Sequence, residues 1–174
     1  MKQVLLALGL LLLTMAVYYW VNNRFVPKNG GILTSTEKQI LFEVPGDILV
    51  ETEREIKIKA KHEKGKIAGF SLNLNYKPDE VKIISAEVNQ EIFNSGLEAT
   101  IDENLGKILI KGRYEGEKEI LVNEEVVLAI LKIKGVKKGE TTISADKAPV
   151  IEVWDGEKIT EESFQLSDFK LKFL

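Results

Sequence analysis

The sequence contains no cysteine and one histidine among its 174 residues. The missing cysteine excludes disulfide scaffolds, thiolate zinc sites, cysteine nucleophiles and a lipid-modified N-terminal cysteine. A catalytic triad would have to use His62, which stands in the charged run of residues 61–65, KHEKG. We expect this run to be a solvated loop, and a triad built on His62 is therefore disfavoured.

Other signatures of chemistry are also missing. There is no glycine-rich phosphate loop, and residues 102–106, DENLG, resemble half of a calcium loop without its closing glutamate, which favours a tight hairpin. Glu51, Glu53 and Glu55 could supply the acid and base pair of a glycosidase. They alternate along the end of a predicted strand, however, as surface carboxylates of a soluble sandwich normally do. We therefore predict no enzyme, no cofactor and no metal site.

Basic residues are outnumbered by acidic ones. Twenty-four lysines and arginines stand against 27 aspartates and glutamates, a formal net charge of −3. The first 31 residues hold basic side chains and no acid, so the remainder is more acidic still. An acidic domain repels phosphate backbones, which disfavours a nucleic-acid partner, and we predict none.

A long apolar run occurs once, at residues 4–21, which carry no charge. A helix of about this length crosses a bilayer, so residues 1–22 are predicted as an N-terminal membrane anchor or signal segment. The aromatic residues 18–20 suit the membrane interface, and their bulk after residues 14–16, TMA, disfavours signal-peptidase cleavage. Residues 23–38, with Pro27 and Gly30, are predicted as a tether. The domain would then be membrane-anchored and extracytoplasmic, or secreted if the leader is cleaved.

From Gln39 onward, apolar residues recur at every second position, as in strands that bury one face. Residues 56–60 and 70–76 alternate most clearly. Further strands are predicted at 40–44, 48–50, 81–88, 97–101, 108–110, 126–134, 141–145, 150–154 and 166–173. These eleven ranges, with turn signals between them, predict an all-β domain of about nine or more strands over residues 39–174, an antiparallel two-sheet sandwich.

Trp154 is the one aromatic residue that suggests a ligand. Alternation places it on the side of Glu152, opposite Ile151 and Val153, beside a turn. An exposed tryptophan can stack on a sugar ring or anchor a protein partner. We favour the interpretation that it folds over the end of the core, because sugar platforms need several coplanar rings.

Four segments, in order, carry a family resemblance, and the first is the strand opening of residues 48–50 and 54–58. Residues 67–83, IAGFSLNLNYKPDEVKI, form a strand that ends in tyrosine, proline and acidic residues before an apolar position, and the glycine-led 106–110 and the leucine-alanine strand 128–134 follow. Together they resemble the cohesin domain of bacterial cellulosomes, over roughly residues 39–173. The resemblance implies a nine-stranded jelly-roll sandwich that binds a dockerin, a small calcium-loaded helical module, on one sheet face. The calcium would belong to the partner.

The resemblance and the alternation together predict the partner-binding face. Its residues would be Ser71, Asn73 and Asn75 on one strand and Lys111 and Arg113 on a neighbouring one. We expect this patch to be positive within an acidic domain and to suit an acidic partner. Lys77 departs from the family, which usually has aspartate there.

Three functions remain open at this point. The leading hypothesis is a membrane-tethered, extracytoplasmic, non-catalytic cohesin-like module that binds a protein partner of the dockerin type at the cell surface. The alternative is a carbohydrate-binding module of the same sandwich architecture, which would retain polysaccharide. The third is a structural envelope domain without a ligand. A polar, flat face favours protein docking, whereas aligned aromatics favour glycans.

Overall fold

Alternating apolar and polar residues form strands throughout the part of the chain that the computed structural model describes, residues 38–44, 46, 48–117, 121 and 125–174. These residues contain twelve strands and no helix, hence no helix that could span a bilayer. The predicted anchor and all of the predicted tether except Lys38 lie outside the described residues. The strands are β1 (Lys38–Glu43), β2 (Glu53–His62), β3 (Lys66–Asn75), β4 (Val81–Val88), β5 (Ser95–Asp102), β6 (Lys107–Arg113), β7 (Glu125–Gly135), β8 (Gly139–Ala145), β9 (Val150–Trp154), β10 (Ile159–Ser163), β11 (Gln165–Leu166) and β12 (Phe169–Phe173).

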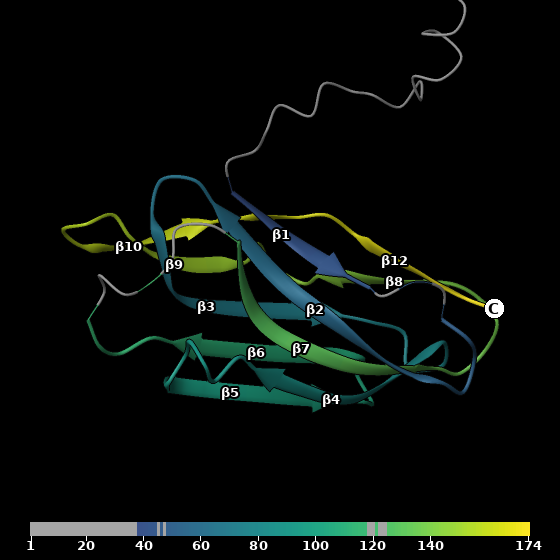
Figure 1. The fold of residues 1–174 in the computed structure, drawn as a ribbon. Coiled ribbons are helices and arrows are strands. Elements are labelled where there is room, and N and C mark those ends of the chain that lie inside the picture. The colour runs from purple at the N-terminus through teal and green to yellow at the C-terminus, as the bar shows by residue number, and fades with distance from the viewer. Residues whose placement is uncertain (1–37, 45, 47, 118–120, 122–124) are drawn as a thin grey trace, which may run out of the picture. The chain divides into compact units, whose positions relative to one another are not determined.

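The strands form two sheets (Figure 1). The first sheet has the order β11-β1-β2-β7-β4, and the second has β10-β9-β3-β6-β5, with β8 bridging β3 and β12. Between β2 and β8 the chain changes sheet repeatedly, and crossovers of this kind are typical of Greek-key and jelly-roll sandwiches. The prediction of an all-β, two-sheet domain is confirmed.

Three details differ from the prediction. The polar β10 has no apolar row to reveal it, and the predicted strand 166–173 is divided between β11 and β12, so there are more than nine strands. Residues 48–50 form no strand but two isolated bridges, from Ile48 to Phe173 and from Val50 to Gly135. The sandwich is also not wholly antiparallel, because β1 pairs with β11 in parallel.

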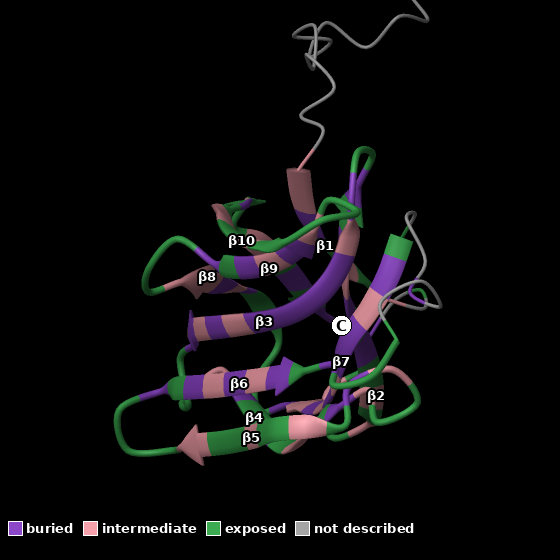
Figure 2. Ribbon diagram, turned by 90° about the vertical axis from the view of Figure 1, so that its left-hand side faces the viewer, coloured by how far each residue is buried: buried purple, intermediate pink, exposed green. Residues whose placement is uncertain are grey.

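The core lies between the two sheets and is mostly aliphatic. Figure 2 shows buried and partly exposed residues alternating along β6 and the second half of β3, as the period of two requires. In β3, Leu72 and Leu74 are fully buried, while Ser71, Asn73 and Asn75 between them are partly exposed. This row therefore fixes which side of β3 faces solvent.

His62 is buried, and the prediction that it lies in a solvated loop is wrong. It is the last residue of β2 and is only 4% exposed. Its Nε2 lies 2.9 Å from Oε2 of Glu162, a residue of β10, and its ring stacks on Phe164. The Lys64 amide donates to Nδ1, so Nε2 must carry the proton and donate to Glu162. A contact across 100 residues of sequence left no local signal.

Candidate functional site

The five residues predicted to bind a partner lie together on the outer side of the second sheet. Strand β3 pairs with β6 so that Ser71 stands opposite Lys111, Asn73 opposite Leu109, and Gly69 opposite Arg113. We call this surface the polar face and define it as the outward side chains of β5, β6, β3, β9 and β10. The structure thus brings Ser71, Asn73, Asn75, Lys111 and Arg113 together, while their role in binding remains a prediction.

Ion pairs between strands of the second sheet lie on the polar face. Lys111 Nζ lies 3.0 Å from Glu98 Oε2 on β5, and Arg113 Nε lies 2.6 Å from Glu152 Oε2 on β9. The hydrogen bond from its guanidinium to Glu152 raises the pKa of Arg113. Both predicted cations therefore have an acidic partner.

A third pair lies at the other end of the face, where Lys107 Nζ is 3.3 Å from Asp146 Oδ2. The Asn75 amide also donates to Asp146, and these two hydrogen bonds, Asn75 first, lower the pKa of the Asp146 carboxyl. Asp102 and Glu161 add further carboxylates on the same face. The expectation of a positive island is wrong, because the fold places an acid beside each of these cations: Glu98 from the adjacent strand β5, Glu152 from β9 beyond β3, and Asp146 from the residue after β8.

Gly69 makes one of these pairs possible. It stands between Glu152 on β9 and Arg113 on β6, in the middle of a row of three strands. A Cβ atom at Gly69 would lie 2.7 Å from Glu152 Oε2, so a side chain there would displace the carboxylate. The bare backbone lets Glu152 reach over β3 to Arg113. Sequence reasoning missed this contact, although a glycine inside a strand often marks a close approach.

The polar face is shallow. One depression of about 210 Å³ is bordered by Ser71, Lys111, Arg113 and Glu152, and a second of about 150 Å³ by residues that include Asn73 and Asp146. Within the described ranges, no group of three or more metal-ligating side chains is found. A flat surface of amides, hydroxyls and paired charges, with the apolar Leu109 and Val150 among them, suits contact with another protein better than enclosure of a small molecule.

Trp154 lies at the end of β9, on the side of Glu152 and opposite the buried Ile151 and Val153, as predicted. It is half-buried against the core, and Lys66 Nζ lies 5.3 Å from the centroid of its ring. None of the other outward residues named above on the polar face is aromatic. The ring therefore stands without a second ring aligned to it on that face.

Comparisons with known proteins agree on the fold. No protein-family model matches the chain, and no curated protein matches it by sequence. A cohesin module of a Clostridium perfringens family 33 glycoside hydrolase is 13% identical with a TM-score of 0.60, covering 80% of this chain and 98% of that one. The seventh type I cohesin of ScaB from Pseudobacteroides cellulosolvens is 14% identical with a TM-score of 0.65, covering 79% and 92%.

The domain has a cohesin-type fold. The cohesin in the Coh-OlpC–Doc435 cohesin–dockerin complex of Clostridium thermocellum is also similar, at 16% identity and a TM-score of 0.64, covering 78% of this chain and 92% of that one. The match spans nearly the whole of each of these cohesin modules. It confirms the resemblance seen in residues 67–83, 106–110 and 128–134, whose strands are β3, β4, β6 and β7.

Proposed function

We propose that this domain is a non-catalytic, cohesin-like module that binds a protein partner of the dockerin type on its polar face. The cohesin-type fold supports the proposal, and one of the similar structures is a complex of a cohesin with a dockerin. The partner would bring its own calcium, as the resemblance implies.

The observation that carries the proposal is the composition of the polar face. Ser71, Asn73 and Asn75 present hydroxyl and amide groups in one line along β3. The Lys111–Glu98 pair lies beside this line, and the Arg113–Glu152 pair crosses β3 at Gly69, where the line begins. Such side chains offer donors and acceptors over a flat area, and protein interfaces use about one hydrogen bond per 100–200 Å². Because the cations are already paired, we expect recognition to depend on shape and hydrogen bonds more than on net charge.

We further propose that residues 1–22 hold the domain at a membrane and that residues 23–38 act as the tether. The uncharged run 4–21 and the aromatic residues 18–20 support the anchor. The domain itself would then lie outside the cytoplasm, where it could recruit a partner to the cell surface.

A carbohydrate-binding module is the second candidate, and Trp154 is the observation that favours it. Its ring is partly exposed at the rim of the sandwich. A lone ring that a lysine already covers is a weak platform, so we place this function second.

The test measures binding of the full chain to calcium-loaded dockerin modules, including the Doc435 partner, by titration calorimetry. Asn73→Arg adds a long charged side chain at the centre of the polar face, and we expect it to weaken binding by about tenfold or more, a change of about 1.4 kcal/mol. The matched control is Leu41→Arg, because Leu41 is an exposed residue of β1 in the other sheet. Equal effects of the two variants, or no binding to any module with calcium present, would refute the proposal.

A second pair of variants separates charge from geometry. Lys111→Glu puts two carboxylates side by side, whereas Lys111→Glu combined with Glu98→Lys restores an ion pair with its ends exchanged. If the partner depends on an ordered, flat face, the double variant regains the affinity that the single one loses.

Trp154→Ala should leave binding to the dockerin module unchanged. Should it instead abolish retention on polysaccharide while Asn73→Arg changes nothing, the carbohydrate-binding alternative replaces docking.

A further inference from the structure

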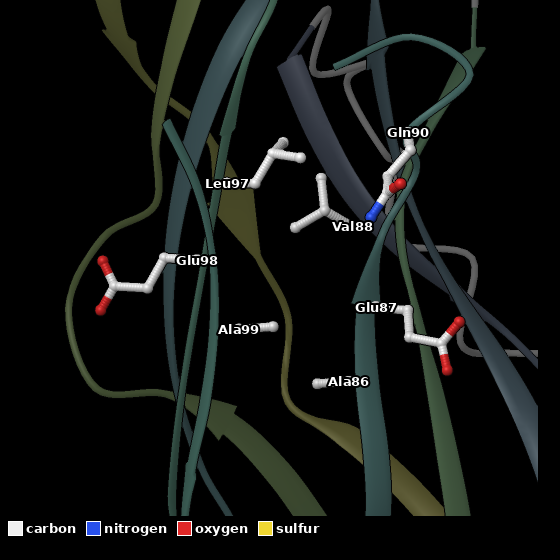
Figure 3. A pocket seen from close by; sticks show the side chains of 7 residues that line it. All are labelled: Ala86, Glu87, Val88, Gln90, Leu97, Glu98 and Ala99. Atoms are coloured by element: carbon white, nitrogen blue, oxygen red, sulfur yellow. The ribbon is translucent and has the colours of Figure 1, made fainter. Parts of the chain in front are cut away.

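The sandwich is open along one side, where the last strands of the two sheets face each other. Strand β4 pairs only with β7, and β5 pairs only with β6, so neither has a strand on its outer edge among the described residues. A groove of about 530 Å³ lies between them (Figure 3). Its lining residues are Ala86, Glu87, Val88, Gln90, Leu97, Glu98 and Ala99.

The side chains of the groove are sorted by type. Figure 3 shows Leu97 and Ala99 of β5 pointing toward Val88 and Ala86 of β4, so that four apolar side chains share the gap. Ala86 and Ala99 have the smallest side chains in this lining. Glu87 and Glu98 point away from the gap on its two sides.

We propose that this groove binds an extended segment of a partner protein, added as a strand to the outer edge of β5, with small apolar and basic side chains at alternate positions. The outer edge of β5 carries backbone N–H and C=O groups that no described strand pairs, and an extended backbone supplies the complementary groups. Every second side chain of the added strand would enter the groove above Ala86 and Ala99.

The charges around the groove select the remaining positions of that segment. Glu87 and Glu98 line the groove and no lysine or arginine does. Glu98 is engaged by Lys111 from the polar face, and Glu87 accepts a hydrogen bond from the Ser85 hydroxyl. Basic side chains at the positions that point away from the groove would lie on the same side of the second sheet as Glu98 and meet its carboxylate.

The strand β5 has little of the usual protection of an edge beyond the register shift between Ser95 and Glu98 at its start. Natural edge strands often carry lysine, proline or inward-pointing charges that block pairing with another chain. The β5 sequence, SGLEATID, has no lysine and no proline, and its inward residues Leu97 and Ala99 are exposed and uncharged. This site is separate from the proposed docking on the polar face and shares only Glu98 with it.

The probe is a synthetic peptide of alternating lysine and valine with the length of β5, added to the full chain. Amide hydrogen exchange is then measured residue by residue. We expect the β5 amides that point away from β6 to exchange at least about tenfold more slowly with peptide present. A peptide of the same composition with its lysines and valines in two blocks should give no such protection, and neither should one whose backbone is N-methylated at alternate residues.

Two variants locate the binding site. Ala99→Lys places a charge inside the groove and should weaken peptide binding by about tenfold or more. Leu41→Lys adds the same charge at an exposed position of β1, which is not next to β4 or β5, and should leave binding unchanged. Thermal melting of both variants establishes that they are folded.

Three results would overturn the proposal. The blocked or N-methylated peptide could protect β5 as well as the alternating one, which would mean attraction of charge alone. The two lysine variants could weaken binding equally. Protection of β5 could also rise with protein concentration in the absence of peptide, in which case a second copy of this chain occupies the edge.

Discussion

Replacing His62 with alanine tests the contact that ties the end of β2 to β10. The change removes the hydrogen bond from Nε2 to the Glu162 carboxylate at 2.9 Å, and a hydrogen bond to a charged group contributes about 1.5–3 kcal/mol. It also removes the ring that stacks on Phe164 at a centroid distance of 5.6 Å, which contributes about 0.5–1.5 kcal/mol. We therefore expect His62→Ala to lower the free energy of unfolding by about 2–4 kcal/mol, a large part of a typical domain's 5–15 kcal/mol.

The assay is urea unfolding of the full chain at neutral pH, followed by circular dichroism, with Lys61→Ala as the control. Lys61 is the exposed neighbour of His62 in the same strand, and its replacement should change the free energy of unfolding by no more than about 0.5 kcal/mol. His62→Gln keeps an N–H donor for Glu162 and should recover part of the loss. If His62→Ala costs no more than Lys61→Ala, the buried hydrogen bond contributes nothing, and the side chain is as solvated as the sequence suggested.

Other predictions address the core, the acid response and the leader. Leu74→Asp should destabilise the domain by about 3 kcal/mol or more because it buries an unpaired charge, whereas Asn73→Asp should cost little; equal melting midpoints would contradict the observed side of β3. Burial opposes ionisation of Glu162, but hydrogen bonds from Lys38 and His62 outweigh it and lower the pKa of its carboxyl below 4.5. The ionised carboxylate therefore stabilises the folded domain above pH 4.5, and this contribution is lost as the pH falls through and below that value. Unfolding midpoints measured down this range should therefore fall less for Glu162→Gln than for the unchanged chain, and parallel curves would contradict this. Intact-mass measurement on membrane fractions should find residues 4–21 retained, and a mature chain that begins at or after Val17 would refute the anchor.

The second half of β3 was predictable because burial there follows a single rule. Leu72 and Leu74 alternate with Ser71, Asn73 and Asn75, and this order alone placed the polar residues on one face. The first half of the same strand breaks the rule, since residues 67–70 are all buried. A register shift between Ile67 and Gly69 and the carboxylate over Gly69 cause this, and both depend on the neighbouring β9.

The charge of the polar face could not be predicted, because it depends on which strands become neighbours. Arg113 and Glu152 are 39 residues apart, and only the order β9-β3-β6 brings them within reach. When each strand is predicted by itself, Lys111 and Arg113 contribute positive charge and the carboxylates that pair with them, Glu98 and Glu152, are not taken into account. Strand β10 was not predicted, for a related reason. It forms because it pairs with β9, and its own five residues, ITEES, contain no row of apolar side chains that would indicate a strand.

The place of β1 between two partners has a mechanical consequence. Its six residues pair with β2 on one side, and two of them pair with β11 on the other. Ladder hydrogen bonds lie across the strand direction, so tension applied at Lys38 along β1 loads them together in shear instead of peeling them one after another. Survival under tension is then set by the rate of rupture and not by the equilibrium between folded and unfolded chains. A strand held in this way suits the end of the domain through which a pull on the preceding residues would enter.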